Sequence, residues 1–209
     1  MKNIERKDRG MIYDPNDKEI QKDQLKRLCM VQEYNSIRPD DISRRKEMLR
    51  DMFASFGEGS YIEQPFYANL GGKYVHIGSN VYANFHLTLV DDGNIYIGDN
   101  TMMGPNVTIA TASHTIEPEL RRRGLQFNKD VHIGKNVWIG SGVTVLPGVT
   151  IGDNTVIGAN SVVTRDIKDN VLAFGNPCRV IREIDERDRE CYYKDEKIDM
   201  DNIKKLYKI

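Results

Sequence analysis

The sequence predicts a mainly β protein, a parallel β-helix with a helical cap before it and a charged segment after it. The first observation is a six-residue repeat: from Ile133 the chain reads IGKNVW, IGSGVT, VLPGVT, IGDNTV, IGANSV and VTRDIK, without a gap. The second is composition, because residues 61–164 contain 13 of the 17 glycines but only 14 charged residues. A period of six is neither the 2 of a strand nor the 3.6 of a helix, so it indicates stacked coils of short strands.

Residues 1–60 hold 25 charged residues and two helical patterns. Asp14-Pro15-Asn16-Asp17 fits an N-cap followed by proline at the first helical position. The apolar residues of this first helix, which runs to about Asn35, are Ile20, Leu28, Val31 and Tyr34. The second helix begins near Pro39-Asp40-Asp41, and its apolar face consists of Ile42, Leu49, Met52, Phe53 and Phe56. We expect this face to cover the open end of the first coil.

Residues 61–175 are predicted to form the β-helix itself. Upstream units of the repeat are IGSNVY, IGDNTM, MGPNVT and IATASH, which begin at Ile77, Ile97, Met103 and Ile109. Each unit supplies a short strand with its first aliphatic residue inward, and a bend where Gly and Asn tolerate positive φ. Three units raise the chain by one strand spacing, so 61–114 and 131–168 predict roughly five coils and a rod of about 24 Å. An ordinary sandwich has no reason to keep this six-residue register.

The repeat is interrupted once, by the loop 115–130, TIEPELRRRGLQFNKD, which carries half of the charges of the glycine-rich segment. Long loops in compact repeats usually have a function. Residues 176–209 leave the period and become highly charged. Within them, residues 183–196 are expected to form a solvated helix, and the last eleven residues are too mixed to suggest a role.

Several classes of protein are excluded by composition. Lys and Arg (30) balance Asp and Glu (31), which argues against binding of nucleic acid or of a membrane through bulk charge. No apolar run approaches the roughly 20 residues of a membrane span, and the polar start lacks the core of a signal peptide, so we expect a cytoplasmic protein. Cys29, Cys178 and Cys191 are widely spaced, which indicates reduced thiols rather than a zinc site. The common nucleotide, hydrolase and metalloprotease motifs are absent.

Histidine is then the residue type that could carry chemistry. His76 and His132 each precede an inward aliphatic residue, so strand alternation points them to solvent or to an interface, and His86 is expected to be structural. His114 stands where the repeat stops and the loop departs. A neutral imidazole can accept a proton at pH 7, which makes His114 a candidate general base. Trp138 faces outward, where a ligand or a neighbouring subunit is expected to cover it.

A set of motifs goes beyond the six-residue period. They are YANF from Tyr82, VDDG from Val90, Ser113-His114, NVWIG from Asn136, PGVTIG from Pro147 and GNPCRVIR from Gly175. With these motifs the chain resembles the maltose/galactoside O-acetyltransferase family over about residues 11–190. The resemblance implies a left-handed parallel β-helix and a homotrimer with active sites between subunits. It also implies transfer of an acetyl group from acetyl-CoA to a sugar hydroxyl, commonly the 6-hydroxyl of a hexose, a maltose-type sugar or a galactoside, without a metal.

The resemblance assigns roles position by position. His114 matches the catalytic base, Asn84 the asparagine beside it that holds the acceptor or the reacting centre, and Ser141 the backbone N–H that faces the oxyanion. The residues that match the acceptor side are Asp14, Asn69, Tyr82, Asn84, Asp92 and Gln126. The residues that match contacts to CoA are Trp138, Ser141, Ala159, Thr164, Arg165, Arg179 and Arg182, whose cations and backbone donors suit phosphates.

Simpler interpretations exist for some of these residues. Asn84 and Asp92 also fit ordinary turn chemistry, Arg179 and Arg182 also fit solvated surface charges, and Asp14 fits a helix N-cap as well as an acceptor-side carboxylate. Three positions leave the sugar undetermined. Where the family often has an arginine, about ten residues after Asp14, this chain has Gln24, with Lys26 and Arg27 close by. Asn69 stands where Asp or Ser is usual, and Gln126 occupies a position that varies in the family.

Three other functions compete with sugar acetylation. The same scaffold could acetylate a non-sugar acceptor such as a serine, an antibiotic or an amino sugar. A metal enzyme of the γ-carbonic anhydrase type would need three converging histidines, and the spacing of the four histidines gives no obvious cluster. The last alternative is a non-catalytic β-helical binding protein, which would not bind CoA.

Overall fold

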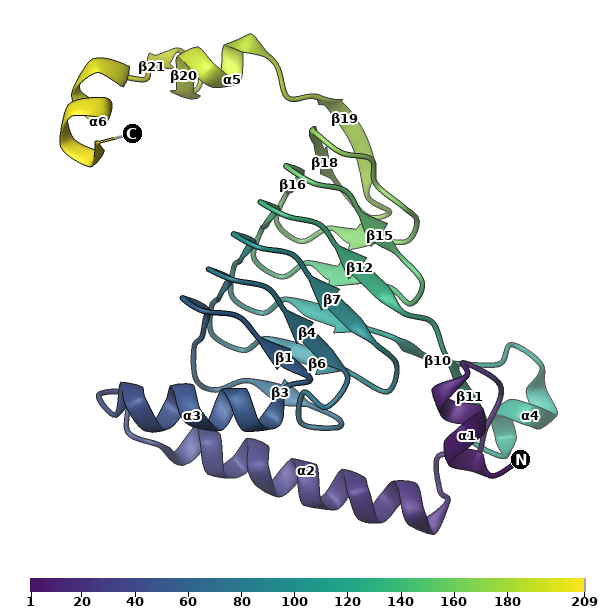
Figure 1. Cartoon of the computed structure of the whole chain (residues 1–209). Helices are drawn as coiled ribbons and strands as arrows, with labels where there is room; N and C mark the ends of the chain where they lie inside the picture. The colour runs from purple at the N-terminus through teal and green to yellow at the C-terminus, as the bar shows by residue number, and fades with distance from the viewer. Residues whose placement is uncertain (209) are drawn as a thin grey trace.

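The computed structural model describes residues 1–208, so the predicted segment 176–209 is described except for Ile209, which lies outside the described residues. The chain folds into a parallel β-solenoid of about six turns with a helical region at its N-terminal end (Figure 1). This confirms the predicted fold class, while the handedness stays a prediction. The helices are α1 (Asn3–Asp8), α2 (Lys18–Ser36), α3 (Ile42–Met52), α4 (Pro118–Arg122), α5 (Glu186–Glu190) and α6 (Met200–Tyr207).

Three parallel sheets form the faces of the solenoid, and we name them in the order in which the chain visits them. Sheet I contains β1 (Ser55–Phe56), β4 (Val75–Ile77), β7 (Ile95–Ile97), β12 (Val131–Ile133) and β15 (Thr150–Ile151). Sheet II contains β2 (Tyr61–Ile62), β5 (Tyr82–Ala83), β8 (Met102–Met103), β13 (Trp138–Ile139), β16 (Val156–Ile157) and β18 (Val171–Phe174). Sheet III contains β3 (Tyr67–Ala68), β6 (Thr88–Val90), β9 (Thr108–Ala110), β14 (Thr144–Val145) and β17 (Val162–Val163).

The first coil begins earlier than predicted. The pair Ser55-Phe56 already lies in register with His76-Ile77, so the solenoid starts before residue 61 and has about six turns rather than five. The sequence of this coil does not reveal it, because its units lack the Ile-Gly pair that marks the later ones. In all coils the aliphatic residue of each unit points into a continuous buried core, as the repeat predicts.

Asparagines form the corners where the chain turns from one sheet to the next. Those that follow sheet I are Asn80, Asn100, Asn136, Asn154 and Asn170, and all five have positive φ between 54° and 59°. Asparagine tolerates this left-handed conformation because its short polar side chain bonds locally. Their amides also stack from coil to coil, as between Asn136 Nδ2 and Asn154 Oδ1 at 2.9 Å. The expected turn role of these residues is confirmed.

The outward histidines lie as predicted. The rings of His76 and His132 stack on either side of Tyr96, with centroids 4.6 and 4.7 Å from the Tyr96 centroid, on the outer face of sheet I. His86 has a positive φ of 62° and stacks loosely on Tyr67, which fits a structural role. No group of three or more His, Cys, Asp or Glu residues that could hold a metal occurs within residues 1–208.

Helices α2 and α3 lie across the first coil (Figure 1). Buried Tyr34, Leu49 and Phe53 pack into the same core cluster as the aliphatic column, so the predicted cap is present. Its details differ from the prediction, since Ile42 is 62% exposed and does not belong to the buried face. Helix α1 goes beyond the prediction, because its six residues are mostly polar and too few to show a period.

The predicted start of the long helix is wrong. Asp17, not Asp14, caps α2, and its carboxylate accepts a hydrogen bond from the backbone N–H of Glu19 at 2.9 Å. Asp14 instead accepts from the backbone N–H of Asn16 at 2.9 Å, in a turn that precedes the helix. Aspartate is favoured both as a helix N-cap and in a turn, so the sequence alone does not show which of the two aspartates caps the helix. The second helix is capped by Asp41, within the predicted start.

The charged C-terminal segment is mixed rather than helical. Strand β19 (Arg179–Glu183) runs antiparallel to β18, and of the predicted helix 183–196 only α5 forms. A hairpin of β20 (Cys191–Tyr193) and β21 (Glu196–Lys197) ends it, and α6 follows. The segment beyond β19 projects away from the solenoid (Figure 1). The three cysteines are free thiols, as expected, and no helix within residues 1–208 has the length and apolar content to cross a bilayer.

Candidate active site

The loop that interrupts the repeat builds a small antiparallel ribbon. Strand β10 (Ala112–His114) pairs with β11 (Gln126–Asn128), so that His114 lies opposite Gln126. On its other side Gln126 bridges Tyr13, with backbone N–H to carbonyl bonds of 2.9 and 3.1 Å in the two directions. The ribbon therefore places His114, Gln126 and Tyr13 side by side, although Tyr13 is far away in the sequence.

The imidazole of His114 is exposed and oriented by one contact. Its Nδ1 atom lies 3.0 Å from the carbonyl oxygen of Leu125. Because a carbonyl oxygen can only accept, Nδ1 carries the proton of the neutral ring and Nε2 keeps its lone pair. This geometry suits a general base that faces solvent or a substrate. The sequence does not indicate what orients His114, since the partner is a main-chain atom of the loop.

Three of the predicted acceptor-side residues meet at one buried carboxylate. Asp92 is only 7% exposed. Its Oδ2 atom accepts a hydrogen bond from Asn69 Nδ2 at 2.9 Å, and its Oδ1 atom accepts one from Gln126 Nε2 at 3.1 Å. Asn69 and Gln126, two of the positions that leave the sugar undetermined, thus donate to the same group. A carboxylate has about four lone-pair sites, so room remains for one more donor beside these two and Tyr13.

Tyr13 completes this network, and sequence reasoning misses it. Its hydroxyl donates to Asp92 Oδ1 at 3.4 Å and receives a hydrogen bond from the amide of Gln126. Burial, together with the charge of Asp92, raises the pKa of Tyr13, so the hydroxyl stays protonated and acts as a donor. Asn128 adds a hydrogen bond to the main-chain carbonyl of Asp92 at 2.9 Å. Tyr13 gives no signal because it lies outside the repeat, and the motif that begins at Asp14 does not include it.

Asp91 fixes the loop that carries Asn69. Its carboxylate is fully buried and accepts from the backbone N–H groups of Leu70, at 2.7 Å, and Gly72, at 2.9 Å. Burial raises the pKa of Asp91 to about 6 against these two bonds. Asp14, half-buried beside Tyr13, is held at its backbone N–H by Asn3. The acceptor-side candidates Asp14, Asn69, Asp92 and Gln126 therefore share one region with His114.

Tyr82 and Asn84 lie elsewhere. Asn84 follows β5 at the corner between sheets II and III, whereas Asp92 follows β6 at the corner between sheets III and I. The whole of β6 separates the two corners. Within the turn, Asn84 Oδ1 accepts from the N–H of Phe85 at 2.7 Å. The structure therefore does not bring Asn84 and His114 together within one chain.

Four of the CoA-side candidates divide between the same two corners. Ser141 and Ala159 are exposed and occupy the corner of Asn84, where the coils approach so closely that a Cβ atom on Gly140 would lie 2.6 Å from the nitrogen of Ala159. Thr164 and Arg165 follow β17 at the corner of His114, also exposed. Trp138 is 55% exposed on sheet II. Each chain thus carries two separate parts of the predicted site.

The two arginines of β19 differ in their partners. Arg182 forms an ion pair with Asp188, with Nη1 and Oδ2 2.6 Å apart, and this pairing lowers the pKa of Asp188 to about 2. Arg179 is exposed and donates to the carbonyl of Cys178 at 2.8 Å. Arg179 therefore keeps more of its donors free for an anionic ligand than Arg182 does.

Two family models match the chain. They are the bacterial transferase hexapeptide (six repeats) over residues 130–165 and the maltose acetyltransferase hexapeptide capping motif over residues 8–57. Galactoside O-acetyltransferase from Lactococcus lactis is 49% identical over 192 residues, which are 92% of this chain and 93% of that protein. Galactoside O-acetyltransferase from Escherichia coli is 44% identical over 84% of this chain and 86% of that protein.

Solved structures agree with this relationship. A galactoside acetyltransferase in complex with coenzyme A superimposes with a TM-score of 0.91 and 44% identity, over 95% of this chain and 99% of that one. A maltose O-acetyltransferase from Clostridium difficile 630 gives a TM-score of 0.86 and 42% identity, over 88% of this chain and 98% of that one. The repeat, the capping helices and these relatives together show that the chain belongs to the maltose/galactoside O-acetyltransferase family of hexapeptide-repeat acetyltransferases.

Proposed function

We propose that this protein transfers an acetyl group from acetyl-CoA to the 6-hydroxyl of a hexose, a maltose-type sugar or a galactoside, with His114 as general base. The observation that carries the proposal is the bond between His114 Nδ1 and the Leu125 carbonyl, which leaves Nε2 as the proton acceptor. It lies beside the Asp92 network in a chain of this acetyltransferase family. The acetyl-CoA donor is further supported by relatives whose solved structures hold coenzyme A or acetyl-CoA.

The reaction then proceeds by direct attack. His114 Nε2 takes the proton from the acceptor hydroxyl as its oxygen bonds to the thioester carbonyl carbon. The backbone N–H of Ser141 faces the oxyanion of the tetrahedral intermediate. When the intermediate collapses, the carbon–sulfur bond breaks and the imidazolium returns its proton to the departing thiolate. The products are the acetylated sugar and CoA, and His114 is neutral again.

Asp92 binds the acceptor together with Asn69 and Gln126, and Asp14 lies at the edge of the same region. The buried carboxylate accepts hydrogen bonds from sugar hydroxyls, while the amide oxygens of Asn69 and Gln126 offer further acceptors. Tyr82 and Asn84 reach the acceptor from another copy of the chain. Asn84 there holds the acceptor or the reacting centre beside His114.

The position of the two corners supports a site shared between copies of the chain. His114 and Asp92 lie at one corner, and Asn84, Ser141 and Ala159 at another. A cyclic homotrimer would complete the site, because the loop 115–130 of each copy then lies against the corner of its neighbour that carries Asn84 and Ser141. Trp138 offers an apolar surface to the pantetheine arm of CoA. Thr164, Arg165 and Arg179 bind polar and phosphate groups of CoA. Arg182 joins them if its pair with Asp188 opens.

The proposal is tested by His114→Ala. Thiol release from acetyl-CoA, with maltose and methyl galactoside as acceptors, is expected to fall by about 10²–10⁴-fold, the usual contribution of a general base. Binding of acetyl-CoA in calorimetry should be unchanged. His132→Ala is the matched control, since that ring stacks on Tyr96 on the outer face of sheet I, and its activity should equal that of the wild type. Undiminished turnover in His114→Ala would contradict the mechanism.

The position of acetylation is tested on the product. Proton NMR of the acetylated sugar is expected to show a downfield shift of the two hydrogens on carbon 6. Acetylation at a ring hydroxyl would overturn the regiochemistry and leave the general base intact. If the enzyme acetylated serine or an amino sugar but neither maltose nor methyl galactoside, the proposed sugar acceptor would be wrong and the alternative acceptor class would take its place.

A further inference from the structure

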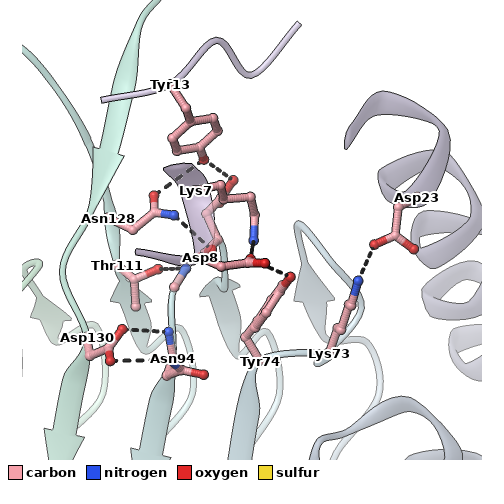
Figure 2. Close-up of polar contacts among 12 residues, drawn as sticks. Lys7, Asp8, Tyr13, Asp23, Lys73, Tyr74, Asn94, Thr111, Asn128 and Asp130 are labelled. Atoms are coloured by element: carbon pink, nitrogen blue, oxygen red, sulfur yellow. Dashed lines mark hydrogen bonds and ion pairs between the residues drawn. The ribbon is translucent and has the colours of Figure 1, made fainter. Parts of the chain in front are cut away.

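A lysine lies buried behind the Asp92 network. Lys7, on α1, has a side chain that is 1% exposed, and its Nζ atom has no hydrogen-bond partner within residues 1–208. The ammonium lies 3.7 Å from the centroid of the Tyr74 ring and 3.6 Å from Asp8 Oδ1 (Figure 2). Asp8 in turn accepts from the Tyr74 hydroxyl at 3.1 Å. A buried ammonium is costly, so a position that keeps it without a direct hydrogen bond requires an explanation.

The ammonium borders a small polar cavity of about 160 Å³ that also reaches Asp92. Its charged lining residues are Lys7, Asp8, Asp92 and Asp130. Lys7 is the one cation among these described residues. Asp130 is already bound by the backbone and side chain of Asn94, at 2.9 and 3.2 Å, and Asp8 by Tyr74. A polar cavity of this volume takes up water, through which an ammonium can reach a carboxylate.

We propose that Lys7 is a positioning residue for the acceptor: its ammonium, supported by Tyr74 and Asp8, acts across the cavity on Asp92 and keeps that carboxylate aligned with Asn69 and Gln126. The inference rests on the proposed function, because it assigns Asp92 to the acceptor. A carboxylate that is only 7% exposed gains little from bulk water, so a cation behind it has a large effect. The segment that follows this helix carries Tyr13, which also bonds to Asp92.

A purely structural role for Lys7 predicts different results. In that case the cluster would only fix α1 to the solenoid, and breaking the bond between Tyr74 and Asp8 would have the same effect as removing the charge. Tyr74→Phe removes that bond and keeps both the ring and the ammonium. Lys73→Met is the charge control: Lys73 Nζ lies 5.3 Å from the centroid of the same ring but pairs with Asp23 at 2.7 Å and does not line the cavity.

The experiment measures acceptor and donor kinetics on the full chain. Thiol release is followed with maltose and methyl galactoside, first at saturating acetyl-CoA and then at a saturating level of the better sugar. In Lys7→Met we expect the acceptor KM to rise about 10-fold while the KM for acetyl-CoA is unchanged. Lys7→Arg restores the charge and should recover most of the acceptor affinity. Tyr74→Phe and Lys73→Met should have the wild-type acceptor KM.

The pH profile gives a readout that a structural role would not move. Burial lowers the pKa of Lys7, so the charge that favours the acceptor is present below this pKa and is lost as the pH rises through it. In the wild type, kcat/KM for the acceptor should therefore begin to decrease at a pH below the ordinary pKa of lysine. Burial raises the pKa of Tyr13 and Tyr74, the phenols nearest to the cavity, so the fall is not theirs. The other charged groups that border the same cavity are the carboxylates of Asp8, Asp92 and Asp130.

The variants separate the outcomes. Lys7→Arg should retain acceptor kcat/KM to higher pH than the wild type, and this comparison holds even if Lys7→Met does not fold. An unchanged acceptor KM in a folded Lys7→Met, an equal rise in Tyr74→Phe, or an identical alkaline profile in Lys7→Arg would each overturn the role of Lys7. If the wild type transfers acetyl to neither sugar, the proposed function fails and this inference fails with it. Transfer by the wild type with no effect of Lys7 would overturn the inference alone.

Discussion

Asp91 and Asp92 are neighbours in the chain, yet their carboxylates have different surroundings. Asp92 receives three side-chain donors, from Tyr13, Asn69 and Gln126, and borders a cavity. Asp91 receives only backbone N–H groups, from Leu70 and Gly72, and is sealed from solvent. At the scale of single residues, the first of the pair holds a loop in place and the second is available to a ligand.

The raised pKa of Asp91 predicts a pH dependence of stability. The folded-state pKa, about 6, lies above the ordinary value of 3.8, so the folded protein binds this proton more tightly than the unfolded chain does. The resulting stability is present below the ordinary pKa and is lost as the pH rises through about 6. Between pH 5 and pH 7 this group should lower the free energy of unfolding by about 1–2 kcal/mol.

Urea unfolding of the wild type and of Asp91→Asn at both pH values checks this expectation. The amide does not titrate, so the variant should lack this part of the pH dependence, although its loss of an N–H acceptor lowers its stability at either pH. The quantity to compare is the change from pH 5 to pH 7 within each protein. Equal changes in the two proteins would contradict the assignment to Asp91.

At the scale of elements, the loop 115–130 supplies the main-chain atom that orients His114. Helix α4 is followed by Gly124, whose φ is +73°, and the chain then presents the carbonyl of Leu125 to His114. The backbone N–H of Leu125 is fixed in turn by the carbonyl of Leu120 at 3.2 Å. The left-handed turn at Gly124 therefore sets the position of the atom that orients the base.

We predict that Gly124→Ala reduces kcat more than it changes the acceptor KM. A Cβ atom at Gly124 would meet only Asn16 Nδ2, at 3.6 Å, so the problem is backbone strain rather than space. Alanine in this conformation costs about 1–2 kcal/mol, and the turn relieves the strain by moving the Leu125 carbonyl. Asparagine tolerates the conformation, so Gly124→Asn should retain more activity than Gly124→Ala. Steady-state kinetics decide, and equal kcat values for the two variants would refute this account.

The elements that the sequence predicts are those whose conformation depends on residues close to one another in the chain. The inward aliphatic column and the left-handed corner asparagines, such as Asn80 and Asn154, recur at fixed spacing, so the solenoid follows from the repeat. The start of α2 depends on a choice between Asp14 and Asp17 that local patterns leave open. The Tyr13–Gln126 bridge joins residues that are 113 apart, which no local pattern reveals.

The candidate site shows the same division. In the sequence, the end of the repeat and the family motifs mark His114, Asp92 and the loop residue Gln126. The contacts that orient them carry no such mark: a main-chain carbonyl at Leu125 and a phenol at Tyr13. Motifs mark the candidate reacting groups, whereas a main-chain partner such as Leu125 can have any side chain, and Tyr13 comes from a segment far away in the sequence.

At the scale of the whole molecule, the solenoid keeps two halves of the proposed site apart. One half is the corner between sheets III and I, with His114. The other half is the corner between sheets II and III, with Asn84 and Ser141. A rigid stack of coils cannot bend to join its own corners, because each coil is bonded to the next along three sheets. We therefore predict that activity depends on assembly, and a monomer in light scattering would contradict the shared site.

Complementation between two inactive variants tests this assembly directly. His114→Ala and Asn84→Ala are co-expressed with different tags, and trimers that carry both tags are purified by two affinity steps. In a ring of three with each site formed by His114 of one copy and Asn84 of the next, either mixed composition contains a single junction with both residues intact. The mixed trimers should therefore recover about one third of the wild-type turnover, whereas each variant alone stays inactive. If both residues served the same chain, no mixed trimer would hold an intact site and no activity would return.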